Sequence, residues 1–264
     1  MISEQDGCAQ ALEFADVSFS YGPRRVVDGL SLCIPHEELT CVLGPNGCGK
    51  STAVKLASGM LKPQAGSVFV DGKPTLSYST KQRARTMAVL SQAPKPPAMT
   101  VEMLVACGRY PHKSHQGRMD AADRACIDDA IRLLGLERFR ENDVRSLSGG
   151  ERQRAYMAMA LAQDARIMVM DEPTAFLDVK AAHDAMGLAR MMVDERKKSV
   201  IVIVHDVDLA LRYADRIVVM DRGSLAGQGT SSEILELGAI ERAFGVSVYK
   251  HNAADGTAYS LFPR

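Results

Sequence analysis

The chain has 264 residues, of which 46% are hydrophobic and 24% charged, the balance of an ordinary folded protein. Basic and acidic residues are equal at 32 each, so no net positive charge draws the chain to nucleic acid, and we expect no such partner. The longest apolar stretches, such as residues 200–204, are far shorter than the roughly 20 residues of a membrane span, and the polar N-terminus does not resemble a signal peptide. We therefore expect a cytosolic chain that reaches a membrane only by docking onto other subunits.

Short apolar segments predict strands in the first part of the chain. Residues 11–20, 31–35 and 39–43 carry these segments, and the last is a compact, buried strand that ends at Gly44. A glycine-rich turn then opens a helix near Gly49.

The composition changes in the middle of the chain. Strands are predicted at residues 66–72 and 87–90, and a proline-rich link at residues 93–97 can continue neither a strand nor a helix. Beyond the link the pattern is helical. The stretch from about 93 to 148 is therefore an all-helical insert in an otherwise α/β chain.

Two helices are predicted within the insert, at residues 100–108 and 120–136. Thr100 and Asp120 are suitable N-caps for them, because their side-chain oxygens can accept from free backbone N–H groups of the first turn.

Uninterrupted apolar strands return at residues 167–170 and 200–204, as suits a parallel sheet that is buried on both faces. The segment between them, residues 180–196, has the length of a right-handed helical crossover. A last strand at residues 216–220 precedes a short helical tail, which leaves little room for a separate C-terminal domain.

Residues 44–52, Gly-Pro-Asn-Gly-Cys-Gly-Lys-Ser-Thr, fit the phosphate-loop pattern GxxxxGK[ST]. Glycines let backbone N–H groups point at phosphate oxygens, and the following helix adds its positive end. Lys50 can reach the β- and γ-phosphates, and the Ser51 hydroxyl can bind Mg²⁺. A chance glycine turn is the alternative, which the preceding strand and following helix disfavour. The predicted phosphate-binding residues are Gly44, Pro45, Asn46, Gly47, Cys48, Gly49, Lys50, Ser51 and Thr52.

Asp171 and Glu172 directly follow the buried strand at residues 167–170. In an open α/β sheet, ligands bind beyond the carboxyl ends of the strands. Asp171 is then placed to hold Mg²⁺, and Glu172 to polarise the attacking water as general base. Alone, the pair would more often be a solvated acidic turn, but the phosphate loop favours the catalytic interpretation.

Residues 147–154, Leu-Ser-Gly-Gly-Glu-Arg-Gln-Arg, open another helix. Ser148 is the predicted N-cap, Glu151 completes a capping box, and Gly149 and Gly150 leave backbone N–H groups bare. This helix start is either a second anion site or simply a well-capped helix, and the spacing alone does not choose between them.

Residues 147–154 resemble the signature motif of the ABC ATPase family, and the order of motifs agrees along nearly the whole chain. Tyr21 resembles the aromatic that stacks on adenine, and Gln92 the glutamine that senses Mg²⁺ and water. Residues 173–178 resemble the D-loop, and His205 the switch histidine. Tyr21 or His205 alone would more often be a packing residue, but their positions in the series favour these roles.

The resemblance implies a P-loop NTPase α/β fold, with a parallel sheet, an N-terminal antiparallel β subdomain and the all-helical insert. It implies one ATPase domain over residues 10–250, with its core at 10–92 and 149–250 and the helical subdomain at about 93–148. The implied catalytic residues are Glu172, His205, Gln92 and Lys50. The implied metal-contacting residues are Ser51, Gln92 and Asp171.

The resemblance also implies ATP and Mg²⁺ as ligands and a head-to-tail dimer of two copies. Each ATP would lie between residues 44–52 of one copy and Ser148, Gly149 and Gly150 of the other. Because the γ-phosphate would be held from both sides, ATP would favour the closed dimer and hydrolysis would release it.

Residues 100–112 and 205–223 resemble segments of the ATPases of importers for ferric siderophores, haem and cobalamin, and we favour ferric siderophores. This group implies transmembrane permease subunits, indirectly a substrate-binding protein, and a peripheral location at the cytoplasmic face of the inner membrane. Residues 109–112 are predicted to meet the membrane subunit, or else to form an ordinary helix-end turn.

The alternative function is a soluble ABC ATPase without membrane partners. Repair ATPases of that kind carry long coiled coils, and translation ATPases carry two cassettes, whereas this chain shows neither. Cys48 departs from the family pattern, in which Ser or Ala is commoner. The helix N-terminus tends to lower a thiol's pKa whereas phosphate charge opposes the thiolate, so Cys48 is either a reactive thiol that MgATP protects or an inert small residue.

Overall fold

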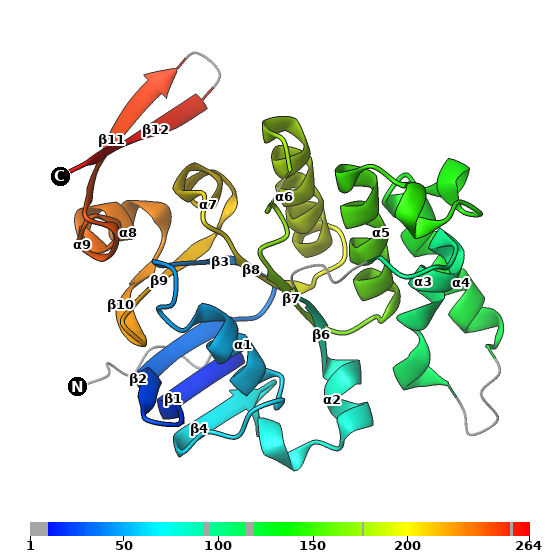
Figure 1. Cartoon of the computed structure of the whole chain (residues 1–264), viewed down its shortest axis with the longest axis horizontal. Helices are drawn as coiled ribbons and strands as arrows, with labels where there is room; N and C mark the ends of the chain where they lie inside the picture. Colours follow the sequence, from blue (N-terminus) through cyan, green and yellow to red (C-terminus); the bar gives the residue numbers. More distant parts are fainter. Residues whose placement is uncertain (1–9, 92–95, 114–118, 176, 254–255) are drawn as a thin grey trace.

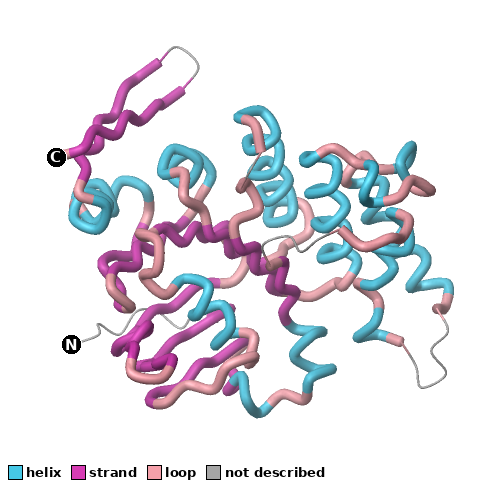
Figure 2. Tube along the Cα trace, in the orientation of Figure 1, coloured by secondary structure: helices cyan, strands magenta, loops and turns pink. Residues whose placement is uncertain are grey.

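The strands form a central sheet, a second sheet beside it and a separate hairpin (Figure 1). The computed structural model describes residues 10–91, 96–113, 119–175, 177–253 and 256–264. The central sheet has the strand order β10-β9-β3-β8-β7-β6, and the second sheet the order β2-β1-β4-β5. Helix α1 lies between the two sheets, and α5, α6 and α7 lie on the other side of the central sheet (Figures 1 and 2).

The strands are β1 (Gln10–Tyr21), β2 (Arg24–Pro35), β3 (Leu39–Leu43), β4 (Ala65–Val70), β5 (Lys73–Pro74), β6 (Met87–Leu90), β7 (Ile167–Asp171), β8 (Ser199–Ile203), β9 (Arg216–Asp221), β10 (Ser224–Gly229), β11 (Val246–Ala253) and β12 (Gly256–Pro263). The α-helices are α1 (Lys50–Ala57), α2 (Thr80–Thr86), α3 (Val101–Cys107), α4 (Ala121–Leu133), α5 (Gly149–Ala162), α6 (Val179–Asp194), α7 (Val207–Tyr213), α8 (Ser231–Glu236) and α9 (Ala239–Phe244). Short 3-10 helices are η1 (Thr75–Ser77), η2 (Tyr110–His112), η3 (Glu137–Phe139) and η4 (Val144–Ser146).

The pairing confirms the predicted α/β fold class. Strands β3, β6, β7, β8 and β9 run parallel, and β10 is an antiparallel edge strand on β9. The second sheet is antiparallel throughout. Within the described ranges, none of the helices has the length and apolar character needed to cross a membrane.

The central sheet is apolar on both faces, which explains its uninterrupted apolar strands. In β7, Ile167 and Val169 contact the core shared with α1 and the second sheet. Met168 and Met170 contact the core beneath the helices on the opposite face. Successive side chains of a strand point to opposite faces, so a strand with two buried faces needs an apolar residue at every position. Each of these side chains contributes about 1.5–3 kcal/mol on burial.

Helices α3 and α4 of the insert pack against α5 (Figure 1). Thr100 and Asp120 are N-caps, as predicted: their side chains accept from the backbone N–H groups of Met103 and Asp123. Gly108 ends α3 so close to α5 that an added Cβ would lie 2.2 Å from the carbonyl oxygen of Met159. A glycine is therefore required where these two helices meet.

The prediction of a helical tail after residue 220 is wrong in part. Strand β10 follows first, then α8 and α9, and the chain continues into the β11–β12 hairpin. Val248 and Tyr259 lie on the face of the hairpin that packs against the large core. The β-branched and aromatic residues of the hairpin, such as Val246, Val248 and Tyr249, suit strands better than a helix.

Candidate nucleotide-binding site

Three neighbouring strands of the central sheet, β3, β8 and β7, end at the same edge and position the predicted site residues. The phosphate loop follows β3, Asp171 is the last residue of β7, and His205 lies two residues beyond β8. The backbone N–H of Glu172 donates to the carbonyl oxygen of Ile203 at 3.1 Å. The residues after β7 are therefore fixed against β8.

The phosphate loop curls around the ammonium group of Lys50. This group donates to the carbonyl oxygens of Gly44 at 2.6 Å and Pro45 at 3.0 Å, and the residue is only 6% exposed. Gly49 is the N-cap of α1 with a φ of 107°, and an added Cβ would lie 2.7 Å from the carbonyl oxygen of Val26. Only glycine fits this position, for conformational and steric reasons.

The turn between β9 and β10 supports the phosphate loop, a contact that the sequence analysis missed. The backbone N–H of Gly223 donates to the carbonyl oxygen of Cys48 at 3.0 Å. The carbonyl oxygen of Gly223 accepts from the N–H of Asp28 at 2.9 Å. This turn therefore ties the loop to the start of β2, so that β2 passes alongside the loop.

One cavity of about 320 Å³ brings together the predicted adenine-stacking tyrosine, the phosphate loop and the predicted general base. Its lining residues are Tyr21, Arg24, Val26, Asn46, Gly47, Gly49, Lys50, Ser51, Thr52 and Glu172. These residues are far apart in the sequence and come from β1, β2, the loop with α1, and the end of β7. Arg24 and Val26 are lining residues that the sequence analysis did not identify.

Tyr21 presents an aromatic ring to this cavity. The ring is 46% exposed and packs edge-to-face against Phe19, with ring centroids 4.9 Å apart. Phe19 itself is buried in the core of the second sheet. Tyr21 is thus held by a rigid neighbour, and much of its ring surface stays available to a planar ligand.

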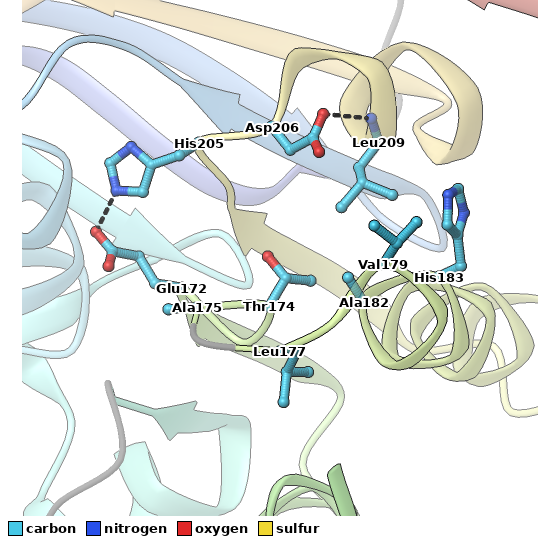
Figure 3. A pocket seen from close by; sticks show the side chains of 10 residues that line it. All are labelled: Glu172, Thr174, Ala175, Leu177, Val179, Ala182, His183, His205, Asp206 and Leu209. Atoms are coloured by element: carbon cyan, nitrogen blue, oxygen red, sulfur yellow. Dashed lines mark hydrogen bonds and ion pairs between the residues drawn. The ribbon is translucent and has the colours of Figure 1, made fainter. Parts of the chain in front are cut away.

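Glu172 and His205 face each other, and their side chains are joined by a 2.6 Å hydrogen bond between the imidazole Nε2 and the carboxylate Oε1 (Figure 3). Glu172 has a φ of 55°, in the left-handed region that a side chain seldom adopts. Such a conformation costs roughly 1–3 kcal/mol and occurs mostly at active sites and switches. A second cavity of about 230 Å³, shown in Figure 3, also borders Glu172, so this carboxylate lies between two hollows.

Asp171 and Ser51 form an oxygen-rich pair near the loop. Burial raises the pKa of Asp171; a hydrogen bond from the Ser51 hydroxyl opposes this rise, and the negative charge of Glu172 adds to it. The Oδ1 atom of Asp171 is buried without a hydrogen-bond partner among the described residues. No group of three or more His, Cys, Asp or Glu side chains in the described ranges is arranged to hold a metal. The pair therefore fits a hard cation such as Mg²⁺ whose other ligands come from phosphate and water.

The signature segment lies outside the lining of the 320 Å³ cavity, as far as the structure describes the chain. Ser148 accepts from the N–H of Glu151, and the Glu151 carboxylate accepts in return from the N–H of Ser148 at 3.0 Å. This is the predicted capping box. Gly149 begins α5, and Ser148 and Gly149 are exposed. Gln92 lies outside the described residues.

Residues 109–112, predicted to meet a membrane subunit or to form a helix-end turn, comprise Arg109 and the short helix η2. Arg109 is 6% exposed, and its guanidinium donates to the Asp123 carboxylate and to the carbonyl oxygen of Ala162, each at 2.8 Å. The His112 imidazole is hydrogen-bonded to the carbonyl oxygen of Gln163 at 2.8 Å. These two side chains tie the segment to α4 and the end of α5, whereas Tyr110 is 65% exposed and Pro111 and His112 are partly exposed.

Cys48 differs from the prediction of a lowered thiol pKa. It is 5% exposed, and burial raises the pKa of its thiol although the Lys50 ammonium group opposes the rise. The removal of water therefore outweighs the favourable charge at this helix start. Cys48 fits the interpretation of an inert small residue better than that of a reactive thiol.

Comparisons with known proteins agree with this geometry. The sequence pattern of the ABC transporter family matches residues 27–175. The petrobactin import ATP-binding protein FpuD of Bacillus anthracis is 39% identical over 86% of this chain and 84% of its own length. The iron(3+)-hydroxamate import ATP-binding protein FhuC of Bacillus subtilis is 35% identical over 89% of this chain and 88% of its own.

A dimeric structure of the ATP-binding cassette MJ0796, bound to ADP and Pi in a post-hydrolysis state, superposes with a TM-score of 0.72. It is 27% identical to this chain and covers 83% of it and 98% of its own length. The chain therefore belongs to the ABC transporter family. It is an ATP-binding subunit of that family, and as such it hydrolyses ATP.

Proposed function

We propose that this chain is the ATP-hydrolysing subunit of a membrane importer of ferric siderophores. Permease subunits would hold it at the cytoplasmic face of the inner membrane. A substrate-binding protein would deliver the ferric siderophore to these permease subunits. The main support for an ATPase site is the single cavity that is lined by Tyr21, by residues of the 44–52 loop and by Glu172. The cargo rests on the relatives FpuD and FhuC, whose names specify import of petrobactin and of iron(3+)-hydroxamate. Residues 10–250 form its single ATPase domain, with α3 and α4 in a helical subdomain at about 93–148.

The nucleotide is bound along the cavity. Adenine stacks on Tyr21, and the phosphates lie on the N–H groups of residues 44–52 at the positive end of α1. Lys50 then exchanges its carbonyl partners, Gly44 and Pro45, for the β- and γ-phosphate oxygens. Glu172, which lines the same cavity, is then the carboxylate at the γ-phosphate.

Hydrolysis transfers the γ-phosphoryl group to water. Glu172 accepts a proton from the attacking water as the new P–O bond forms and the bond to the β–γ bridging oxygen breaks, which gives ADP and phosphate. His205 orients the Glu172 carboxylate through their 2.6 Å hydrogen bond. Asp171, Ser51 and Gln92 would hold Mg²⁺, which would neutralise charge on the phosphates.

The second half of the site is supplied by another copy of the chain. Ser148, Gly149 and Gly150 do not line the cavity of their own chain, and the Ser148 N–H is already bonded to Glu151, so we assign the bare N–H groups of Gly149 and Gly150 to a nucleotide that a second copy holds. The dimeric relative MJ0796 supports such an arrangement. ATP would then close the dimer and hydrolysis would open it, which is the stroke that a transporter requires.

Co-purification tests the proposal. A tagged Glu172→Gln variant is produced in the native host, and the membranes are extracted in mild detergent with MgATP. A Lys50→Ala variant, which should not bind nucleotide, is treated in the same way as the control. We expect a multi-spanning membrane protein at near one-to-one ratio, together with a closed dimer for Glu172→Gln alone. Recovery of only a soluble partner or of nucleic acid would overturn the importer assignment and leave the ATPase chemistry in place.

A further inference from the structure

We infer that Arg24 is an additional phosphate-binding residue, which contacts the triphosphate of ATP from the side of the cavity opposite Lys50. The inference rests on the proposed function, because it assigns a further contact within the same nucleotide site. Arg24 belongs to none of the motifs found in the sequence. Only the position of β2 beside the phosphate loop identifies Arg24 as a residue of the site.

The strand pairing places Arg24 beside the adenine-stacking residue. Arg24 is the first residue of β2, and in the antiparallel register with β1 it lies directly opposite Tyr21. Both side chains line the 320 Å³ cavity. A planar aromatic ring and a guanidinium group therefore leave neighbouring strands at the same end of the second sheet.

Arg24 also lies against the phosphate loop. An added Cβ at Gly47 would be 3.6 Å from its Nη2 atom, so the guanidinium group rests on the exposed turn of the loop. Two residues further along β2, the carbonyl oxygen of Val26 closely approaches Gly49. The hydrogen bond from Asp28 to Gly223 fixes the same stretch of β2 to the turn that holds Cys48. The position of Arg24 beside the loop is thus set by backbone contacts on a rigid strand.

The guanidinium group of Arg24 is unpaired. Among the described residues, Arg24 has no hydrogen-bond or ion-pair partner, whereas the neighbouring Arg25 donates to the Asp28 carboxylate at 2.9 Å. Glu172 is the acidic side chain that lines the cavity, and its Oε1 atom already accepts from His205. A guanidinium group with free N–H donors can bind phosphate oxygens in a bidentate manner.

The two cations approach the loop from different sides. The Lys50 ammonium group is buried inside the curl, on the carbonyl oxygens of Gly44 and Pro45. Arg24 is exposed and lies outside, over Gly47. A phosphate chain that sits on the N–H groups of the loop would pass between them. Arg24 therefore binds the phosphate chain, whereas Tyr21 binds adenine.

The test compares Arg24→Gln with Arg25→Gln in the full-length chain. Each variant removes one exposed guanidinium group from the same end of β2, so the pair is matched in charge and position. The equilibrium affinities for ATP, ADP and adenosine are measured by titration calorimetry, and circular dichroism confirms that each variant is folded. We expect Arg24→Gln to weaken ATP binding by about ten- to a hundredfold, the effect of losing a charge-assisted contact, and to leave adenosine binding unchanged. Arg25→Gln should bind all three ligands as the parent does.

Two results would overturn the inference. If Arg24→Gln bound ATP as tightly as Arg25→Gln, Arg24 would make no phosphate contact. If it lost ATP and adenosine to the same extent, its role would be to shape the pocket around Tyr21. Both results presuppose a parent protein that binds ATP, whereas a parent that bound neither ATP nor ADP would overturn the proposed function itself.

Discussion

The nucleotide cavity and the helical insert use arginine in opposite ways. In the insert, Arg109 is buried and donates to the Asp123 carboxylate and to a carbonyl oxygen at the end of α5. In the cavity, Arg24 is exposed and unpaired among the described residues, on a strand fixed against the phosphate loop. A buried charge requires a partner from the protein itself, whereas a free charge on a rigid wall is available to a ligand. The comparison distinguishes charged side chains that stabilise the fold from charged side chains that are available to bind a ligand.

Lys50 combines features of both classes, because it is buried and yet its described partners are all uncharged groups of the loop: two carbonyl oxygens and the Cys48 thiol. Lys50→Ala should lower the rate of ATP hydrolysis by about 10³-fold or more, since one positioned charge at the transferred phosphoryl group is lost. Nucleotide affinity should fall as well. The exposed Lys62→Ala is the matched control and should keep both rate and affinity.

The Arg109–Asp123 pair should be the most costly ion pair to break. Arg109→Met leaves a buried carboxylate without its partner, and we expect a loss of about 3–5 kcal/mol in the free energy of unfolding, measured by urea denaturation. The double variant Arg109→Met/Asp123→Leu removes both charges and should recover much of this loss. A single variant as stable as the parent would show that the pair does not hold η2 and α4 together.

The same pair predicts a pH dependence of stability. Burial disfavours the charged form of Asp123, but hydrogen bonds from Arg109 and from the Asp120 backbone outweigh it and lower the pKa of this carboxyl below its ordinary value of 3.8. A lowered pKa in the folded state contributes stability that is fully present above the unfolded pKa and is lost as the pH falls through the folded one. Below about pH 4, the stability difference between the parent and Asp123→Asn should therefore shrink. A difference that stayed constant from pH 7 to pH 3 would contradict the pairing.

The smallest effect concerns Cys48, which is buried inside the loop with a raised thiol pKa. During a short treatment with iodoacetamide near pH 7.5, mass spectrometry should detect alkylation of the exposed Cys33 before that of Cys48. ATP hydrolysis should persist while only Cys33 is modified. Rapid labelling of Cys48 that MgATP prevents would restore the interpretation as a reactive thiol.

Much of the fold was predictable because its signals are local. The buried strands appear as continuous apolar runs, Thr100 caps α3, and Asp120 and Ser148 form capping boxes with Asp123 and Glu151. The hairpin at residues 246–263 was missed because its two strands lack a regular alternation of apolar and polar residues and follow two short helices.

The positions of Arg24 and Arg109 were not predicted, because they depend on contacts between distant segments. Arg24 joins the cavity only because β2 pairs with β1 and is tied to the loop through Gly223. Arg109 is buried only because α3, α4 and α5 converge around it. Neither relation has a signature within a single stretch of sequence, since both depend on packing in three dimensions.

The most direct test of the central claim, that Tyr21, the phosphate loop and Glu172 form one ATPase site, is the rate of ATP hydrolysis by Glu172→Gln in the complex with its membrane partner, measured together with ATP affinity. The amide keeps the size of the side chain but cannot accept the proton of the attacking water. We predict that hydrolysis falls by about 10²–10⁴-fold while ATP affinity is retained. Hydrolysis at the parent rate would contradict the assignment of Glu172 as the general base.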